Sequence, residues 1–335
     1  MRADPTVARL SRKLRRIGAR IPGSRTYQEL QRLRRQGRTV HTELNALREE
    51  VGRLTSERLR ASWAPPGHAS SPIPSLDAIR SRADRIFDRS TRALPGIDLD
   101  DAGQLGLLEE LKGRYGELPF AHELQAGLRY HYGNDFFSYS DAIFLSLLVR
   151  HLAPKRVVSV GAGYSSCALL DINDRFFEGA ISCTFVHPDP NELGALLRRS
   201  DFDAHRFITS EVQDVGLEPF AELDAGDILL VDSSHVSKTG SDVNHLFFEV
   251  LPRLRSGVWA QIHGVFYPFE YPEAWVEQGR AWNEDYLVRA FLMFNDAFAI
   301  RLFSSYVVAL HEEWFRREMP LCLENPGGSL WLQRR

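Results

Sequence analysis

The sequence of 335 residues predicts an α/β protein, in which a parallel sheet carries helices on both faces. Three observations lead to this prediction. After residue 156, short apolar runs alternate with longer amphipathic runs, which is the pattern of a parallel sheet with crossover helices. Hydrophobic residues make up 44% of the chain, enough for a large core. The first apolar run ends at glycines that open a helical pattern.

That run, Arg156–Ser166 (RVVSVGAGYSS), predicts a buried strand, a turn at Gly161 and Gly163, and a helix beginning near Ser165. A turn without side-chain bulk lets a ligand approach the backbone, and the free N–H groups of a helix start favour polar or anionic groups. The run indicates a nucleotide-type cofactor site, although glycine turns after strands also serve packing alone. Ser166 stands where the dinucleotide fingerprint has its third glycine, which argues against a dinucleotide oxidoreductase.

The other elements follow in order along the chain. Two helical patterns occupy residues 75–116, and a strongly apolar helix ends near Leu152. Further helices are expected from Ser165, Asn191 and Gly240, and residues 304–317 lie between the last two expected strands. The last two strands are expected to form a hairpin-like edge. The seven expected strands are Val157–Gly161, Ile181–Val186, Arg206–Thr209, Asp227–Asp232, Gly257–His263, Ala297–Leu302 and Gly328–Leu332.

The N-terminal part differs from this domain in charge and pattern. Residues 1–60 carry 16 Arg and Lys against six Asp and Glu, although the whole chain has a net charge of -3. A Pro/Ser-rich linker is expected over 61–75, and the main domain, with its helical lead-in to about residue 152, over 76–335. Apolar residues at alternating spacings of three and four predict a short coiled-coil helix: Leu30, Leu33, Val40, Leu44, Leu47, Val51 and Leu54.

The coiled coil predicts a homo-oligomer formed through residues 26–58, the alternative being a helix docked on its own domain. The basic residues Arg12–Arg16 suit peripheral contact with an anionic surface or simply a solvated face, and no nucleic-acid motif accompanies them. No signal peptide or apolar run of about 20 residues is present, so a cytoplasmic protein is expected. The three cysteines lack CxxC spacing and are expected to be buried thiols.

Polar side chains follow the predicted strands at the ends where ligands bind in open parallel sheets. The first strand leads to Gly161, Gly163, Tyr164 and Ser165. The fourth ends at Asp232 with His235 close behind, and the fifth ends at His263. Two histidines and an aspartate at one edge suit removal of a proton from a hydroxyl. We expect His263 as the base, His235 as the second choice, and Asp232 to orient the histidine or the acceptor.

Several long segments carry a family resemblance. The chain from about Tyr130 onward resembles the bacterial class I S-adenosylmethionine-dependent methyltransferases of the sugar and polysaccharide O-methyltransferase type. The segments that carry it are Asp227–Asn244, Leu251–Gly257, Tyr267–Pro272, Phe136–Asp141, Gly279–Asn283 and Asn325–Ser329.

The resemblance implies a Rossmann-like seven-stranded methyltransferase sheet with S-adenosylmethionine as cofactor. It implies that the glycine turn lies under the methionine part and that an acidic residue after the second strand binds the ribose. Here the nearest such residue is Asp189. Gln213 and Asp214 would lie near the adenine.

Three positions depart from the family pattern. Ser159 replaces the carboxylate that helps to hold the cofactor's ammonium group, and His187 replaces the acid that ends the second strand. Gly264 replaces an aspartate that assists a divalent cation or the substrate. With Asp232 as the only evident hard ligand, no metal site is expected.

The sequence thus predicts an O-methyltransferase that acts on a hydroxyl of a sugar or glycosylated small molecule. The alternative is a catalytically silent or repurposed methyltransferase fold, acting as an oligomeric partner or scaffold or carrying non-methylating chemistry. Aromatic residues are candidates for the acceptor wall, although such clusters equally serve core packing. The candidates for this wall are Tyr164, Tyr267, Phe269, Glu270 and Tyr271.

Overall fold

The computed structural model describes most of the chain after residue 62. The contacts divide the chain into two compact units, Met1–Ser75 and Leu76–Arg335. The basic segment Arg12–Arg16 lies outside the described residues, as does much of the predicted coiled coil. The described residues are 29, 32–33, 36–37, 40, 42–49, 63–161 and 163–335.

The described residues between 29 and 49 are helical. Four of the predicted seam residues lie among them, and the side chains of all four are exposed in the single chain: Leu33, Val40, Leu44 and Leu47.

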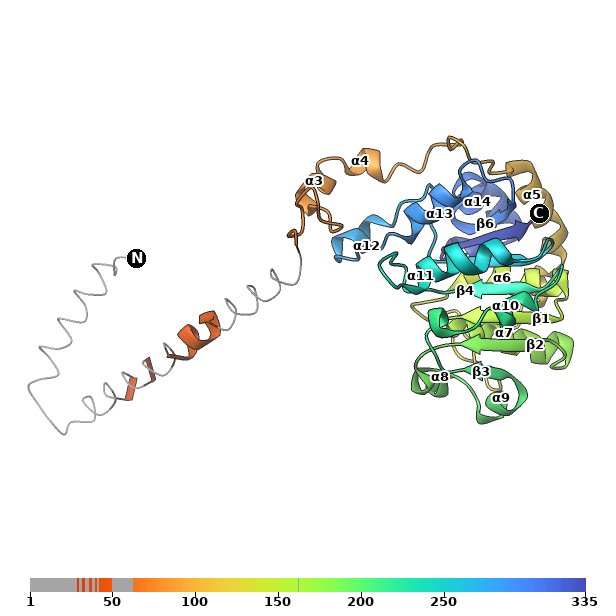
Figure 1. Ribbon diagram of the computed structural model, residues 1–335, viewed down its shortest axis with the longest axis horizontal. Helices are drawn as coiled ribbons and strands as arrows, with labels where there is room; N and C mark the ends of the chain where they lie inside the picture. Colours follow the sequence, from red (N-terminus) through yellow and green to blue (C-terminus); the bar gives the residue numbers. More distant parts are fainter. Residues whose placement is uncertain are drawn as a thin grey trace, which may run out of the picture. The chain divides into compact units, whose positions relative to one another are not determined.

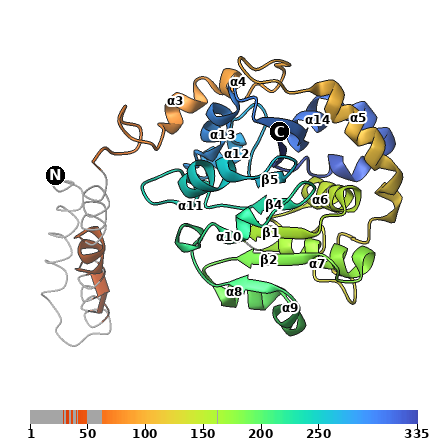
Figure 2. The same ribbon diagram turned by 45° about the vertical axis from the view of Figure 1, so that its right-hand side comes forward.

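The second unit is built on one seven-stranded sheet in the order β3-β2-β1-β4-β5-β7-β6, flanked by helices (Figures 1 and 2). Strands β1 to β5 are parallel, whereas β7 runs antiparallel to both β5 and β6. The seven predicted strands are confirmed, but the sheet is mixed and β7 lies inside it, next to the edge strand β6. The strands are β1 Arg156–Val160, β2 Ser182–Val186, β3 Arg206–Ile208, β4 Ile228–Val231, β5 Trp259–His263, β6 Phe298–Phe303 and β7 Ser329–Arg334.

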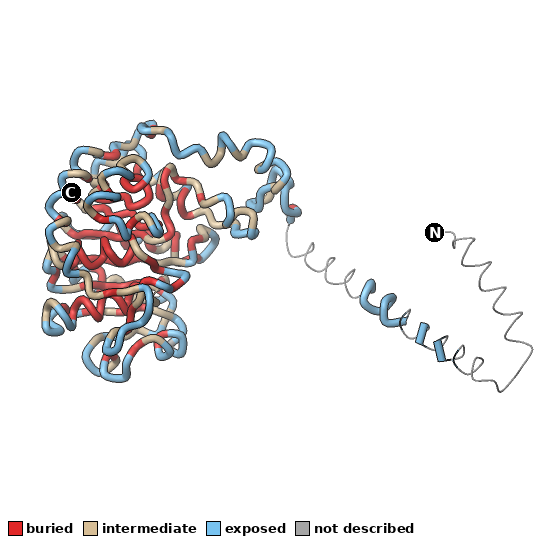
Figure 3. Tube along the Cα trace, turned by 180° about the vertical axis from the view of Figure 1, so that it is seen from behind, coloured by how far each residue is buried: buried red, intermediate tan, exposed pale blue. Residues whose placement is uncertain are grey.

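The central strands form where the sequence is almost continuously apolar. All four residues of β4 are buried, and β1 is buried from Val157 to Val160. Such strands are covered on both faces, as expected for the middle of a parallel sheet. The buried residues gather around the sheet (Figure 3).

The helices connect the strands and supply the lead-in to the sheet. Helix α11 continues through a π-helical turn, Leu246–Val250, and a 3-10 turn, Leu251–Arg253. The helices are α3 Leu76–Arg80, α4 Ala83–Ile86, α5 Asp101–Leu111, α6 Tyr139–Leu152, α7 Tyr164–Phe177, α8 Pro190–Leu196, α9 Arg199–Ala204, α10 Glu218–Ala221, α11 Asp242–His245, α12 Glu273–Glu277, α13 Glu284–Leu292, α14 Ser304–Leu310 and α15 Glu312–Glu318.

A buried ion-pair cluster ties the segment before α6 to helices α7 and α9. The guanidinium group of Arg129 donates hydrogen bonds to Asp171 on α7 at 2.7 Å and to Asp201 on α9 at 2.5 Å. The backbone N–H groups of Arg129 and Tyr130 also donate to Asp171. The cluster thereby holds the segment that leads to Phe136 and Phe137 against the sheet domain.

Two further expectations concern the thiols and the membrane. Cys167, Cys183 and Cys322 are free and buried, as the sequence predicts. Among the helices that the structure describes, none is long and apolar enough to cross a membrane.

Candidate active site

Two pockets open at the carboxyl ends of the parallel strands. The first has a volume of about 410 Å³ and the second about 420 Å³. Gly161, His187, Asp232 and Ser233 line both pockets, so the two adjoin each other. This is the edge at which open α/β sheets bind ligands.

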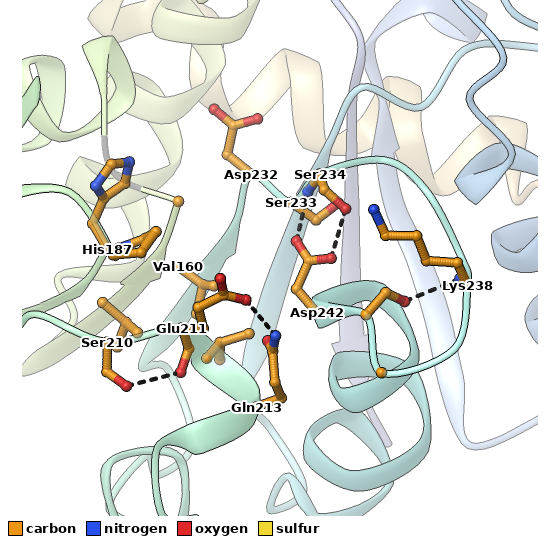
Figure 4. A pocket seen from close by; sticks show the side chains of 16 residues that line it. Val160, His187, Ser210, Glu211, Gln213, Asp232, Ser233, Ser234, Lys238 and Asp242 are labelled. Atoms are coloured by element: carbon orange, nitrogen blue, oxygen red, sulfur yellow. Dashed lines mark hydrogen bonds between the residues drawn. The ribbon is translucent and has the colours of Figure 1, made fainter. Parts of the chain in front are cut away.

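The first pocket lies at the ends of β1, β2, β3 and β4 (Figure 4). The side-chain amide of Gln213 donates a hydrogen bond to the carboxylate of Glu211 at 2.5 Å. Asp242 accepts hydrogen bonds from the backbone N–H and the hydroxyl of Ser234, both at 2.6 Å. Lys238 adds a cationic side chain to the lining. The wall is therefore polar and carries both signs of charge.

The predicted glycine turn adopts a conformation that requires glycine. Gly161 has a φ of 75°, and a Cβ atom there would stand 1.6 Å from the carbonyl oxygen of Asp232. Only a residue without Cβ allows the ends of β1 and β4 to approach so closely. At Gly163, by contrast, an added Cβ would meet nothing within 4 Å.

The second pocket has an aromatic wall formed by Phe136, Phe137 and Tyr164. The rings of Phe136 and Tyr164 are stacked, with centroids 6.2 Å apart and planes 12° apart. Phe136 is 74% exposed, an unusual position for a phenylalanine. Glu192 and His187 add polar groups, so the pocket offers a flat apolar surface beside hydrogen-bonding side chains.

Asp232, His235 and His263 lie together at the ends of β4 and β5. Nδ1 of His263 is 3.1 Å from Oδ1 of Asp232, and Nε2 of His235 is 3.6 Å from the same oxygen. One ligand atom from each of the three residues lies within 4.8 Å of the others. The three residues predicted as catalytic are thus brought together.

Electrostatics favours the charged forms of Asp232 and His263. Burial opposes ionisation of both groups, but their mutual attraction prevails. The charge of His263 keeps the pKa of Asp232 below its usual value. Asp232 and Asp141 raise the pKa of His263 well above its usual value. In the metal-free chain this pair is therefore an ion pair at neutral pH.

A carboxylate holds the outer nitrogen of each histidine. Nδ1 of His235 is 2.9 Å from Oε2 of Glu284, which is fully buried and also accepts the hydroxyl of Ser233 at 2.8 Å. Nε2 of His263 is 3.5 Å from Asp141 at the start of α6. Asp141 also accepts hydrogen bonds from Gly328 and Ser329, so the carboxylate is itself anchored.

Several buried polar atoms at this edge have no hydrogen-bond partner among the described residues. They include the hydroxyls of Ser159 and Ser165 and the side-chain oxygen of Gln213. Buried polar atoms normally have partners, and a missing ligand is one reason for their absence.

Only some of the residues predicted to bind the cofactor line the two pockets. Gly161, Gly163, Tyr164 and Gln213 line the pockets, and Ser165 is buried at the first turn of α7. Asp189, predicted to bind the ribose, is the N-cap of α8, where its side chain accepts the N–H of Asn191, and it lines neither of the two pockets. Asp214 is exposed in a 3-10 turn, and its neighbour Gln213 faces the first pocket.

The prediction of an acceptor wall from residues 267–271 is wrong for its aromatic members. Tyr267, Phe269 and Tyr271 are buried at 2% exposure or less. Tyr267 packs against Phe303 and Tyr306, and Phe269 packs against Phe303. Glu270 accepts a hydrogen bond from the hydroxyl of Tyr286. Tyr267 and Phe269 thus pack around the end of β6, whereas Tyr271 packs against Phe266, Trp282 and Tyr286. Of the predicted wall, Tyr164 lines the second pocket.

Several site residues escaped the sequence analysis. Phe136, Glu192, Glu211 and Lys238 line the pockets. A signal existed for Glu211, which precedes Gln213 by two residues after the third strand. Asp141 ends a segment that carries the family resemblance, but the sequence assigned it no role, and Glu284 gave no signal. Both reach the histidines from helices distant in the sequence.

The comparisons with known proteins agree with this fold. Residues 158–265 match the family model described as a methyltransferase domain. The chain carries a methyltransferase domain. Over 167 residues it is 34% identical to an uncharacterized protein of Archaeoglobus fulgidus, an alignment that covers 48% of this chain and 73% of that protein. The two proteins belong to one family.

Solved structures of methyltransferases are also similar to this methyltransferase-domain protein. A methyltransferase of Podospora anserina, PaMTH1 with SAH bound, is 12% identical with a TM-score of 0.39, covering 79% of this chain and 99% of that one. A candidate O-methyltransferase of Klebsiella pneumoniae is 15% identical with a TM-score of 0.37, covering 77% and 96%.

Proposed function

We propose that the protein is an S-adenosylmethionine-dependent O-methyltransferase that acts on a hydroxyl of a sugar or glycosylated small molecule. One observation carries this proposal: Asp232, hydrogen-bonded to His263, lies on the wall shared by two adjoining pockets. Methyl transfer needs a donor and an acceptor aligned next to each other, with a group that receives the acceptor's proton. The methyltransferase domain over 158–265 supports the same chemistry.

The residues of the first pocket fit S-adenosylmethionine. Gly161 lines the pocket and provides the close backbone approach for the methionine part. The hydroxyls of Ser159 and Ser165 are buried on either side of the glycine turn, outside the pocket lining, and have no partner among the described residues. Gln213, with an unpartnered oxygen, suits the exocyclic amine of adenine. Glu211 takes the role that the sequence analysis assigned to Asp189, because its carboxylate lines the pocket and accepts ribose hydroxyls.

The second pocket suits the acceptor. The face of Phe136 matches the apolar face of a sugar ring, while Glu192 and His187 bind hydroxyl groups. When bound, S-adenosylmethionine supplies an electrophilic methyl group. The reacting hydroxyl lies against the carboxylate of Asp232, and its proton passes toward the imidazole of His235. His263, expected from the sequence to be the base, is already charged in its ion pair with Asp232 and instead orients that carboxylate. Glu284 and Asp141 hold those two rings in place.

Three departures from the family pattern favour a second, competing function. Ser159, His187 and Gly264 leave three acidic positions of the resembled family empty, and each lost charge-assisted contact costs about 1–3 kcal/mol. A methyltransferase fold without catalytic activity, serving as an oligomeric partner, is therefore the competing proposal. Self-association through residues 26–58 belongs to both proposals, and the exposed side chains of Leu33, Val40, Leu44 and Leu47 support it.

Transfer of a tritiated methyl group separates the two functions. The full chain is incubated with labelled S-adenosylmethionine and a panel of sugars, glycosides and simple aromatic alcohols. We expect label on glycosidic acceptors, with Asp232→Asn reducing the rate at least about 100-fold. Label on aromatic alcohols alone would contradict the acceptor class, and no transfer to any acceptor would favour the inactive fold.

A further inference from the structure

The three side chains Asp232, His235 and His263 have the composition of a metal site. They offer one carboxylate and two imidazoles, and the ligand atoms lie within 4.8 Å of one another. Two of the separations are 3.1 Å and 3.6 Å. Zinc bonds of about 2.0–2.1 Å in a tetrahedral arrangement place neighbouring ligand atoms about 3.3 Å apart. The two separations that involve Asp232 therefore already suit an ion, and the two imidazole nitrogens lie within 4.8 Å of each other.

The surroundings of the histidines strengthen this assignment. A metal-binding histidine normally has its other ring nitrogen held by a carboxylate, a carbonyl or water, which sets the tautomer and the direction of the ring. Here Glu284 holds Nδ1 of His235 and Asp141 holds Nε2 of His263. Both carboxylates are nearly inaccessible to solvent. The nitrogens left over are the two that face Asp232.

The packing also keeps the rings in this orientation. The ring of Trp282 lies 4.2 Å from that of His235, and the ring of Phe137 lies 5.2 Å from that of His263, measured between centroids. Gly264 leaves room for His235, because a Cβ atom at this residue would stand 2.5 Å from Cε1 of the ring. Where the resembled family has an aspartate, this chain has Gly264, and the imidazole ring of His235 occupies the space that a side chain at residue 264 would need.

The ligand atoms of Asp232, His235 and His263 do not suit Mg²⁺ but suit Zn²⁺. Magnesium prefers six oxygen ligands in an octahedron, and a single carboxylate does not provide them. Two imidazoles with one carboxylate suit a borderline transition-metal ion such as Zn²⁺. Asp232 as the only hard oxygen ligand was the reason that no metal site was expected from the sequence. The structure adds the two nitrogens.

We infer that Asp232, His235 and His263 bind one Zn²⁺ ion beside the acceptor pocket. Asp232 lines both pockets, so the ion faces the position of the acceptor hydroxyl. A bound ion of this kind polarises an oxygen ligand and lowers the pKa of a hydroxyl. With the ion present, the two imidazoles act as ligands and the ion takes over activation of the hydroxyl. Activation of the acceptor hydroxyl by the ion rests on the proposed function, whereas binding of the ion does not.

The test measures zinc binding by the full chain directly. The protein is freed of metal by dialysis against a chelator and titrated with ZnCl₂ in a calorimeter, and bound zinc is counted by mass spectrometry after gel filtration. We expect one ion per chain. His235→Ala and His263→Ala abolish that stoichiometric binding, and Glu284→Gln weakens it about 10–100-fold by releasing His235.

His311→Ala is the matched control. His311 also pairs with a carboxylate, that of Asp101 at 2.6 Å, but it lies outside the cluster of three ligands. This variant should bind zinc like the unaltered chain. Circular dichroism verifies the fold of each variant, and Co²⁺ in place of Zn²⁺ reports the ligand set through its visible absorption.

The possible outcomes separate this inference from the proposed function. Absence of stoichiometric zinc on the unaltered chain would overturn it. So would unchanged binding by folded His235→Ala and His263→Ala, or equal loss in His311→Ala. S-adenosylmethionine binding is measured on the same samples. A chain that binds zinc but not S-adenosylmethionine supports the metal site and contradicts the methyltransferase proposal, and the opposite result does the reverse.

Discussion

The backbone of Gly264 lies against the imidazole ring of His235, and a Cβ atom at residue 264 would stand 2.5 Å from Cε1 of that ring. Gly264 has a φ of 77° and His235 a φ of 60°, so both residues adopt the left-handed conformation. The ends of β4 and β5 are thereby coupled, because a side chain at residue 264 would occupy the space in which the ring of His235 lies.

Gly264→Ala tests this coupling. The variant combines a left-handed alanine, costing about 1–2 kcal/mol, with a collision that costs about 1–3 kcal/mol more. Gly179→Ala is the control, because Gly179 has a φ of 79° and open space around an added Cβ. Urea unfolding should show the larger loss of stability for Gly264→Ala. Equal losses in the two variants would mean that His235 moves away at no cost.

The buried Arg129 cluster predicts a large loss of stability on removal of its cation. Arg129→Met leaves Asp171 and Asp201 buried without their partner, which costs about 3–5 kcal/mol. Arg253→Met is the control, since Arg253 pairs with Glu249 on the surface and should cost under about 1 kcal/mol. Denaturant unfolding of both variants checks the prediction, which fails if the two losses are alike.

Asp285 predicts a pH-dependent loss of stability. Burial raises its pKa well above the usual value, against the lowering effect of the N–H group of Phe266, and nearby Glu284 adds to the rise. The folded chain therefore holds this proton more tightly than the unfolded chain, whose pKa is about 3.9. The contribution to stability is present at low pH and is lost as pH rises from about 4 through the raised pKa.

Asp285→Asn keeps a side-chain oxygen that accepts the N–H of Phe266 but removes the carboxyl group that titrates. Relative to the unaltered chain, this variant should become progressively more stable as pH rises from 4 to 8. Melting temperatures of both proteins across this range measure the difference, with the exposed Asp296→Asn as control. A difference that stays constant with pH would show that Asp285 does not titrate in this window.

Self-association predicts sensitivity to charge on the exposed apolar positions of the N-terminal helix. Leu44→Glu combined with Leu47→Glu should lower the mass measured by light scattering after gel filtration, because carboxylates at a coiled-coil seam are not tolerated. Arg48→Ala, an exposed charged position on the same helix, should leave the mass unchanged. A monomeric mass for the unaltered chain would contradict self-association.

Much of the sheet was predictable because strands buried on both faces leave a strong local signal. The predicted end of the fifth strand, His263, is its observed end, and the predicted end of the second strand is likewise Val186. The antiparallel pairing of β6 with β7 agrees with the hairpin-like edge expected for the last two strands. The position of β7 between β5 and β6 was not predictable, since the pattern of apolar residues does not give the order of strands in a sheet. Within the site, local spacing identified Asp232 and the two histidines.

Residues that act through the fold left no such signal. Glu284 lies 49 residues from His235 in the sequence, and only the packing of α13 joins them. An acidic residue before a helix, such as Asp189, also serves as an N-cap, so the sequence alone does not separate that role from ribose binding. Tyr267 and Phe269 misled because an aromatic cluster looks the same in sequence whether it lines a pocket or fills a core.

The proposed function depends on whether the first pocket holds S-adenosylmethionine despite Ser159 and His187. Isothermal titration of the full chain, loaded with zinc and freed of it, tests this most directly, with Gly161→Ala as the variant whose Cβ forces the ends of β1 and β4 apart at Asp232. We predict saturable binding of one S-adenosylmethionine per chain, lost in Gly161→Ala. No saturable binding at millimolar S-adenosylmethionine in either metal state would contradict the proposed function.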